Sequence, residues 1–209
     1  MSIHVQPFIL GPLGNNSYLV SDSKKREAVV IDPSFGIEML IDHALDQKLF
    51  ITQVWLTHAH YDHFAGTKAL VDIFPDIQIG LHPEDQKLLD KGGLAGLMGV
   101  NDPHIFTPTI SFKDKGLLQL GEDEFTVYHT PGHSPGHVVF FNQGSRIVFS
   151  GDLIFNHGIG RTDLSGGNYD DILSSIRNKI FTLPPDTIIY SGHGLQTSVG
   201  SEIKSNPFV

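Results

Sequence analysis

The stretch LTHAHYDHFAG, from Leu56 to Gly66, places three histidines and one aspartate within six consecutive positions. The four residues are His58, His60, Asp62 and His63. An apolar segment rich in β-forming residues, ITQVWLT, leads into them and predicts a strand that runs directly into His58. Because residues two apart in an extended backbone point the same way, we expect His58 and His60 to face one point. Asp62 and His63 are expected to begin a helix after the turn and to face a second point nearby.

Three further residues have the same placement after a predicted strand. They are His133 in TPGHSPGH, Asp152 in FSGDL and His193 in YSGHG. Each lies close to glycine, which lets the backbone turn tightly. If these strand ends share one edge of the fold, the side chains converge, as in most sites built on loops. Imidazole and carboxylate ligands suit zinc, iron or manganese, and seven such groups are enough for two ions that share one carboxylate.

The composition limits the class of protein. The chain has 209 residues, of which 40% are hydrophobic and 18% charged, so one domain spanning residues 1–209 is the simplest expectation. No apolar run is long enough for a membrane helix, and the pattern of MSIHVQPFILGPLG leads us to expect no secretion signal. Cysteine is absent, which fits a cytoplasmic protein. The net charge of −9 and scattered basic residues argue against nucleic-acid binding.

Periodicity predicts an α+β fold. Strands are expected over residues 17–22, 27–32, 51–57, 76–82, 124–130, 137–143, 146–150 and 187–193. Helices are expected over residues 37–45, 62–74, 83–89 and 169–181. Residues 91–112 are expected to form a long loop that overhangs a site. Such a pattern predicts two packed sheets with helices outside them.

The order of the candidate ligands resembles the metallo-β-lactamase superfamily. IGRTDLSGG (residues 159–167) and the tail SGHGLQTSVGSEIKSNPF (residues 191–208) are similar to short, bacterial-type members of the hydroxyacylglutathione hydrolase, or glyoxalase II, branch. The resemblance extends from Asn15 to Phe208 and implies an αββα sandwich, with two mixed sheets flanked by helices. It also implies one metal on His58, His60 and His133, a second on Asp62, His63 and His193, and Asp152 bridging them.

The same resemblance implies hydrolysis of a small-molecule thioester such as S-lactoylglutathione. A hydroxide that bridges two divalent ions, zinc with iron or manganese as alternatives, would attack the carbonyl, and Asp62 and Asp152 would be the catalytic carboxylates. Full-length glyoxalase II enzymes have an additional C-terminal helical region that helps to bind glutathione, and this chain stops about where that region would start. The segment FNHGIGRTD (residues 155–163) stands where those enzymes place a basic residue and a tyrosine near glutathione. The thiol carrier is therefore left open.

Other functions remain as alternatives. A persulfide dioxygenase of the same branch uses a single iron, held by the residues that correspond to His58, His60 and His133. The intact second set of ligands, Asp62, His63 and His193, argues against this function. A lactonase or β-lactamase fits the same ligands. A flavodiiron-type protein is disfavoured because that branch has glutamate where this chain has His60. A non-catalytic metal-binding module and a nuclease are the remaining classes, and the acidic balance argues against the nuclease.

Several other residues have two readings each. Asp32 is expected either to orient a metal ligand or to have a structural role in a turn. His137 is expected to be a supporting or structural residue that does not bind metal. Arg161 and Asp163 are expected to pair and fix a loop. Leu94, Leu97 and Met98 are expected to form either an apolar lid or local packing within the loop. His157 lies either in the pocket or outside it. Surface positions are expected for His4, His43, His82 and His104.

Overall fold

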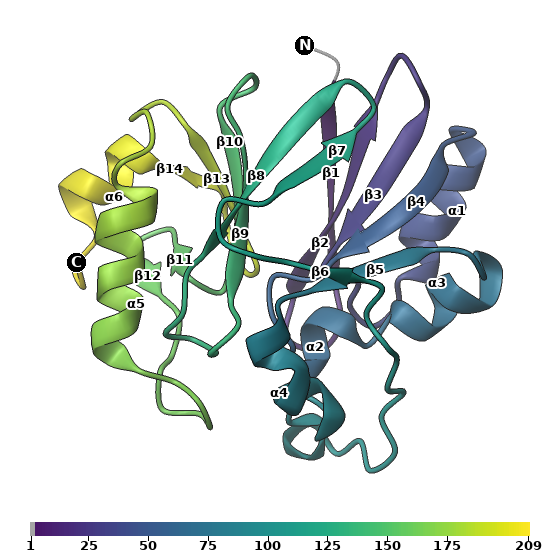
Figure 1. The fold of residues 1–209 in the computed structure, drawn as a ribbon, viewed down its shortest axis with the longest axis horizontal. Coiled ribbons are helices and arrows are strands. Elements are labelled where there is room, and N and C mark those ends of the chain that lie inside the picture. The colour runs from purple at the N-terminus through teal and green to yellow at the C-terminus, as the bar shows by residue number, and fades with distance from the viewer. Residues whose placement is uncertain (1–2) are drawn as a thin grey trace.

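Two six-stranded sheets face each other in a computed structural model that describes residues 3–209 (Figure 1). The first sheet has the order β1 (Ile3–Leu10), β2 (Asn15–Asp22), β3 (Glu27–Ile31), β4 (Phe50–Trp55), β5 (Gln78–Leu81) and β6 (Ile110–Ser111). The second has the order β14 (Thr197–Ser198), β13 (Ile188–Ser191), β10 (Ile147–Gly151), β9 (Val138–Asn142), β8 (Asp123–His129) and β7 (Leu117–Leu120). A short hairpin joins β11 (Ile154–Phe155) to β12 (Gly158–Ile159).

Both sheets are mixed. In the first, β1, β2 and β3 pair antiparallel, and β3 to β6 pair parallel. In the second, β7 to β10 pair antiparallel, and β10 pairs parallel with β13. Helices cover the outer faces, with α1 (Glu38–Asp46) and α3 (Thr67–Ile73) on one side and α5 (Tyr169–Ser175) and α6 (Val199–Ser205) on the other (Figure 1). The predicted αββα architecture is confirmed.

Aromatic side chains fill the space between the sheets. Trp55 of β4 is fully buried, and its ring centroid lies 5.2 Å from Phe125 of β8 and 5.4 Å from Phe140 of β9. Phe149 of β10 lies 5.1 Å from Tyr18 of β2. Strands covered on both faces read as nearly continuous apolar runs, as EAVVI and IVFSG do here. This core holds the strand ends of the two sheets in a fixed relation.

Some predicted elements differ from the structure. The predicted helix over residues 62–74 is divided into α2 (Tyr61–Phe64) and α3, because the backbone N–H of Gly66 donates to Pro33 O at 2.9 Å. A Cβ at Gly66 would lie 2.4 Å from Ser34 O, so the break requires glycine. The predicted helix over 83–89 starts as a 3₁₀ turn (Pro83–Asp85) before α4 (Gln86–Asp90).

Two further regions also differ. The predicted helix over 169–181 continues after α5 as a π turn (Ile176–Ile180). The predicted loop over 91–112 contains a 3₁₀ turn (Ala95–Met98) and the short strand β6. Within residues 3–209, none of the helices has the length and apolar character required to cross a membrane.

Candidate metal centre

The ends of strands from both sheets deliver the seven candidate ligands to one edge of the sandwich. Strand β4 leads into the opening motif, and the turn after it starts α2 at Tyr61. Strands β10 and β13 are parallel neighbours, so their carboxyl ends lie together and bring Asp152 beside His193. His133 comes from the loop between β8 and β9. The fold therefore gathers side chains that are up to 135 positions apart, from His58 to His193.

Three histidines form the first group. Their donor atoms lie within 4.8 Å of one another, and all three side chains are buried: His58, His60 and His133. Nδ1 of His60 lies 2.9 Å from Nε2 of His133. The ring centroid of His58 lies 4.7 Å from that of His60 and 4.8 Å from that of His133. This geometry could hold one cation.

Asp62, His63 and His193 form the second group. Their donor atoms also lie within 4.8 Å of one another. Oδ2 of Asp62 lies 3.5 Å from Nε2 of His63 and 3.5 Å from Nε2 of His193. The amide of Asn15 donates to the same oxygen at 2.8 Å and so holds the carboxylate towards the two rings.

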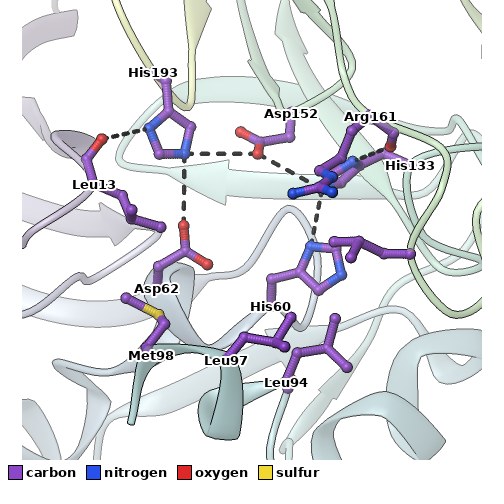
Figure 2. A pocket seen from close by; sticks show the side chains of 12 residues that line it. Leu13, His60, Asp62, Leu94, Leu97, Met98, His133, Asp152, Arg161 and His193 are labelled. Carbon is purple, nitrogen blue, oxygen red and sulfur yellow. Dashed lines mark hydrogen bonds and ion pairs between the residues drawn. The ribbon is translucent and has the colours of Figure 1, made fainter.

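Asp152 lies between the two groups (Figure 2). Its Oδ1 lies 3.4 Å from Nε2 of His63. Its Oδ2 lies 3.6 Å from Nε2 of His133 and 3.6 Å from Nε2 of His193. A single carboxylate thus contacts histidines of both groups, which is the arrangement that a bridging ligand needs.

Unpaired buried atoms test whether metal ions fit. Nε2 of His58, His60 and His63 and Oδ1 of Asp152 are buried without a hydrogen-bond partner. Buried polar atoms are nearly always paired, and an unplaced ion is one of the accepted explanations for a group that is not. Because nitrogen lone pairs and carboxylate oxygens are metal donors, the residues present fit divalent cations.

Asp32 orients two of the histidines from behind. Its Oδ2 lies 3.0 Å from Nδ1 of His63. The same oxygen accepts a hydrogen bond at 2.6 Å from Oγ1 of Thr57, which lies 3.0 Å from Nδ1 of His58. Asp32 also has a positive φ of 51° at the turn after β3. Both readings left open by the sequence therefore apply, because Asp32 forms a turn and supports ring nitrogens.

Backbone carbonyls orient two other histidines. Nδ1 of His133 donates to Arg161 O at 2.8 Å, and Nδ1 of His193 donates to Leu13 O at 3.2 Å. A carbonyl only accepts, so Nδ1 of each ring carries a proton, and Nε2 is the atom that faces the centre. His137 differs because Asp152 N donates to its Nε2 at 3.2 Å and its Nδ1 contacts Thr130. Both of its nitrogens are occupied, as expected for a supporting residue.

Asp85 is a supporting residue that the sequence did not reveal. It is fully buried, and its Oδ2 accepts from Ala59 N at 2.9 Å and from Ser134 Oγ at 2.8 Å. Its Oδ1 accepts from Gly136 N at 2.6 Å. The carboxylate therefore ties the loop that contains the opening motif to the loop that contains His133. No pattern in PEDQKLL marks it, because its partners are 26 to 51 residues away.

The electrostatics of the metal-free centre differ between the two groups. Burial disfavours the charged form of His63, but the carboxylates of Asp152, Asp62 and Asp32 outweigh burial and hold the pKa of His63 well above its usual value. Burial, followed by neighbouring histidines, holds the pKa of His58 well below its usual value. Burial opposes ionisation of Asp152, yet His63 and other histidines lower its pKa below the usual range. Charged groups are thus concentrated around His63, where a protonated ring lies among ionised carboxylates, whereas the ring of His58 is neutral.

A pocket of about 330 Å³ opens over the centre. Besides candidate ligands it is lined by Leu13, Gly93, Leu94, Leu97, Met98, Arg161 and Leu164. Figure 2 shows the three side chains from residues 94–98 on the side opposite Asp152 and His193. These side chains line the pocket, as the lid reading expected. Met98 also packs against the core of the first sheet, so the local-packing reading applies to it as well.

The remaining expectations have mixed outcomes. Arg161 and Asp163 pair as predicted, with two hydrogen bonds of 2.7 and 2.8 Å. The prediction that His82 is a surface residue is wrong, because it is 8% exposed and stacks on His129 at 4.1 Å between ring centroids. His157 contacts Ser205 O at 3.2 Å and is not among the residues that line the pocket. Of the other predicted surface histidines, His4 and His104 are exposed and His43 is half-buried.

Comparison with known proteins gives a family model and several full-length relatives. A model described as the metallo-beta-lactamase superfamily matches residues 10–193. Hydroxyacylglutathione hydrolase GloC of Haemophilus influenzae is 36% identical over 93% of this chain and 92% of that protein. A protein of Aquifex aeolicus described as uncharacterized is 34% identical over 100% of this chain and 97% of that protein.

Solved structures show the same fold. BLEG-1, a B3 metallo-beta-lactamase, superposes with a TM-score of 0.89 at 38% identity and covers 98% of this chain and 99% of its own. TTHA1623, solved in a di-iron-bound form, has a TM-score of 0.88 at 36% identity, with coverages of 98% and 100%. ETHE1 from Myxococcus xanthus has a TM-score of 0.81 at 26% identity, with coverages of 98% and 83%.

Proposed function

The chain belongs to the metallo-β-lactamase superfamily, and from that premise we propose that it is a dinuclear metal hydrolase that cleaves a thioester. The observation that carries the proposal is the convergence of five histidines and two aspartates in two groups that share Asp152. The identity of 36% with a hydroxyacylglutathione hydrolase supports a thioester as the substrate class. S-lactoylglutathione is the first substrate to test.

The proposed ligand assignment follows the two groups. His58, His60 and His133 would hold one ion, Asp62, His63 and His193 the other, and Asp152 both. Divalent ions would supply Lewis acidity and lower the pKa of water so that it can attack near neutral pH. Zinc suits these ligands, and the similarity to a protein solved with two irons supports iron as well.

The chain's own residues supply position and a proton acceptor. Asp62 lines the pocket, and its Oδ2 is fixed by Asn15, so its carboxylate can accept a proton from the attacking water. That water forms a bond to the carbonyl carbon, the carbon–sulfur bond breaks, and the products are a carboxylate and a thiol. A thiol has a pKa of about 8.5, so the leaving group needs little protonation. This matters because the lining residues include no general acid apart from the candidate ligands and Arg161.

Elemental analysis with initial rates tests the proposal. Purified protein is assayed for metal content and for hydrolysis of S-lactoylglutathione and two other thioesters, with oxygen uptake recorded in parallel. Two metal ions per chain, thioester turnover and no oxygen uptake would support the hydrolase. One iron per chain with oxygen uptake would overturn it in favour of a persulfide dioxygenase.

A second candidate is hydrolysis of a β-lactam ring. It is supported by the similarity to BLEG-1, which covers 98% of this chain at 38% identity. A β-lactam and a lactone therefore belong in the same substrate panel. Turnover of a β-lactam at least as efficient as that of every thioester would favour this candidate.

A further inference from the structure

Exposed leucines gather at the mouth of the pocket. Leu97 is 74% exposed and Leu13 is 57% exposed, and both line the cavity above the polar centre. Leu94, Met98 and Leu164 complete the apolar part of the lining. Exposed apolar side chains are ordinary when they are scattered, but a contiguous apolar surface beside a few convergent polar groups is typical of a ligand site.

Backbone hydrogen bonds position the segments that carry these side chains next to the centre. Tyr61 N, at the start of α2, donates to Gly93 O at 2.8 Å. Gly93 has a positive φ of 58°, and a Cβ there would lie 2.5 Å from Ala59 O, so the loop lies directly on the metal motif. On the other side of the pocket, Leu13 O accepts from Nδ1 of His193. The backbone segments that carry Leu13, Leu94, Leu97 and Met98, together called the apolar wall, are therefore tied directly to the candidate ligands.

The pocket offers little to an anionic group away from the centre. Of the described residues that line it, Arg161 is the only lysine or arginine. Its guanidinium is already bound to Asp163 by two hydrogen bonds of 2.7 and 2.8 Å. A carrier such as glutathione, which has two carboxylates, would find a single cationic side chain whose charge Asp163 already offsets, whereas an alkyl chain would find Leu13 and Leu97 uncovered.

We propose that the substrate is a thioester with an apolar alkyl chain attached to its carbonyl carbon or its sulfur, and that this chain lies on Leu13, Leu97 and Met98. The proposal rests on the proposed thioesterase function and specifies its substrate class. The apolar chain contributes binding energy by covering surface that is otherwise exposed to water.

Two substrate series on the metal-loaded protein test the proposal. In the first, acyl groups from acetyl to octanoyl are attached to the small uncharged thiol N-acetylcysteamine. In the second, alkanethiols of increasing length carry a constant acetyl group. We expect kcat/KM to rise about two- to fourfold per methylene in one of the two series, which identifies the end that binds the apolar wall. Equal kcat/KM along both series would overturn the proposal.

A matched pair of variants locates the effect. Leu97→Ser should flatten the rise of kcat/KM with chain length, because it removes apolar surface from the pocket lining. Leu117→Ser is the control, because Leu117 is likewise an exposed leucine, at 57%, but lies on β7, outside the pocket lining. A Leu97→Ser enzyme with the same chain-length dependence as the Leu117→Ser enzyme would contradict the assignment to this wall.

Binding measurements separate this inference from the proposed function. Ketones in which a methylene replaces the sulfur cannot be hydrolysed, and calorimetry gives their dissociation constants directly. Affinity that increases with chain length supports the apolar site even if no thioester is turned over, in which case the hydrolase proposal alone fails. Thioester turnover without any chain-length effect on binding or rate leaves the hydrolase proposal and overturns the apolar site.

Discussion

Oδ2 of Asp32 lies 3.0 Å from Nδ1 of His63, while Nε2 of the same ring lies 3.4 Å from Asp152 and 3.5 Å from Asp62. One buried carboxylate therefore fixes the ring from behind and leaves the opposite nitrogen for the centre. Through Thr57 the same oxygen also reaches His58, so both groups of ligands depend on it.

Replacing Asp32 by asparagine should weaken metal binding. The amide would place a donor or a weaker acceptor against Nδ1 of His63 and Oγ1 of Thr57, so we expect a loss of about 10- to 100-fold in metal affinity. Competition with a chelator of known affinity measures the loss. Asp72→Asn is the control, because Asp72 is exposed and pairs with Lys68 on the surface. Equal affinities of the two variants would contradict the supporting role.

Replacing Asp85 by alanine should destabilise the fold. The change leaves three donors without their acceptor, namely Ala59 N, Ser134 Oγ and Gly136 N. A buried donor left unpaired costs about 1–3 kcal/mol, so we expect a loss of at least about 2 kcal/mol in the free energy of unfolding. Urea unfolding of the metal-free protein measures it. Asp90→Ala, at an exposed carboxylate of α4, should change stability little, and a similar loss in both variants would count against the prediction.

Replacing Asp152 by alanine should remove bound metal and nearly all turnover. The change deletes the only carboxylate that contacts His63, His133 and His193 together among the described residues. Metal content and kcat are measured on the same preparation. Asp186→Ala is the control, because Asp186 pairs with Arg146 on the exposed surface. A variant that retains two metal ions and the full rate would show that Asp152 does not bridge.

Metal uptake should release a proton at the second group and not at His58. In the metal-free protein the pKa of His63 is raised, since burial is outweighed by three carboxylates, so the ring is protonated at neutral pH. Metal must displace that proton, and affinity should therefore rise with pH by up to about tenfold per unit. The pKa of His58 is lowered, mainly by burial, so its ring is already neutral. Calorimetry in buffers with different ionisation enthalpies counts the protons, and uptake without proton release would contradict the expectation.

The sequence predicts those parts of the centre that lie close together along the chain. His58, His60, Asp62 and His63 follow one strand, so spacing alone indicates their convergence. The roles of Asp85 and Asn15 depend on contacts across the fold, at separations of 26 to 51 residues and 47 residues, and no local pattern reveals them. The buried position of His82 depends in the same way on its stacking against His129 from the other sheet.

The fold shows a similar division. Apolar runs predict strands, and β4, β9 and β10 lie where expected; of these, β9 and β10 are buried along their whole length. Strand β1 was not predicted, because IHVQPFIL contains a proline and lies at an edge, where proline is tolerated. The break at Gly66 was also not predicted, since helical periodicity continues across it and only the contact with Pro33 interrupts the helix.

The contact between Asn15 and the turn at His193 has a consequence for synthesis on the ribosome. Asn15 emerges early, whereas the turn that it pairs with is translated 178 residues later. A nascent polypeptide therefore contains His58, His60 and His63 long before His193, the partner of Asp62, has been translated. The second group of candidate ligands would then be complete only after His193 has been translated, so nascent chains that stop before this residue would lack part of the metal centre.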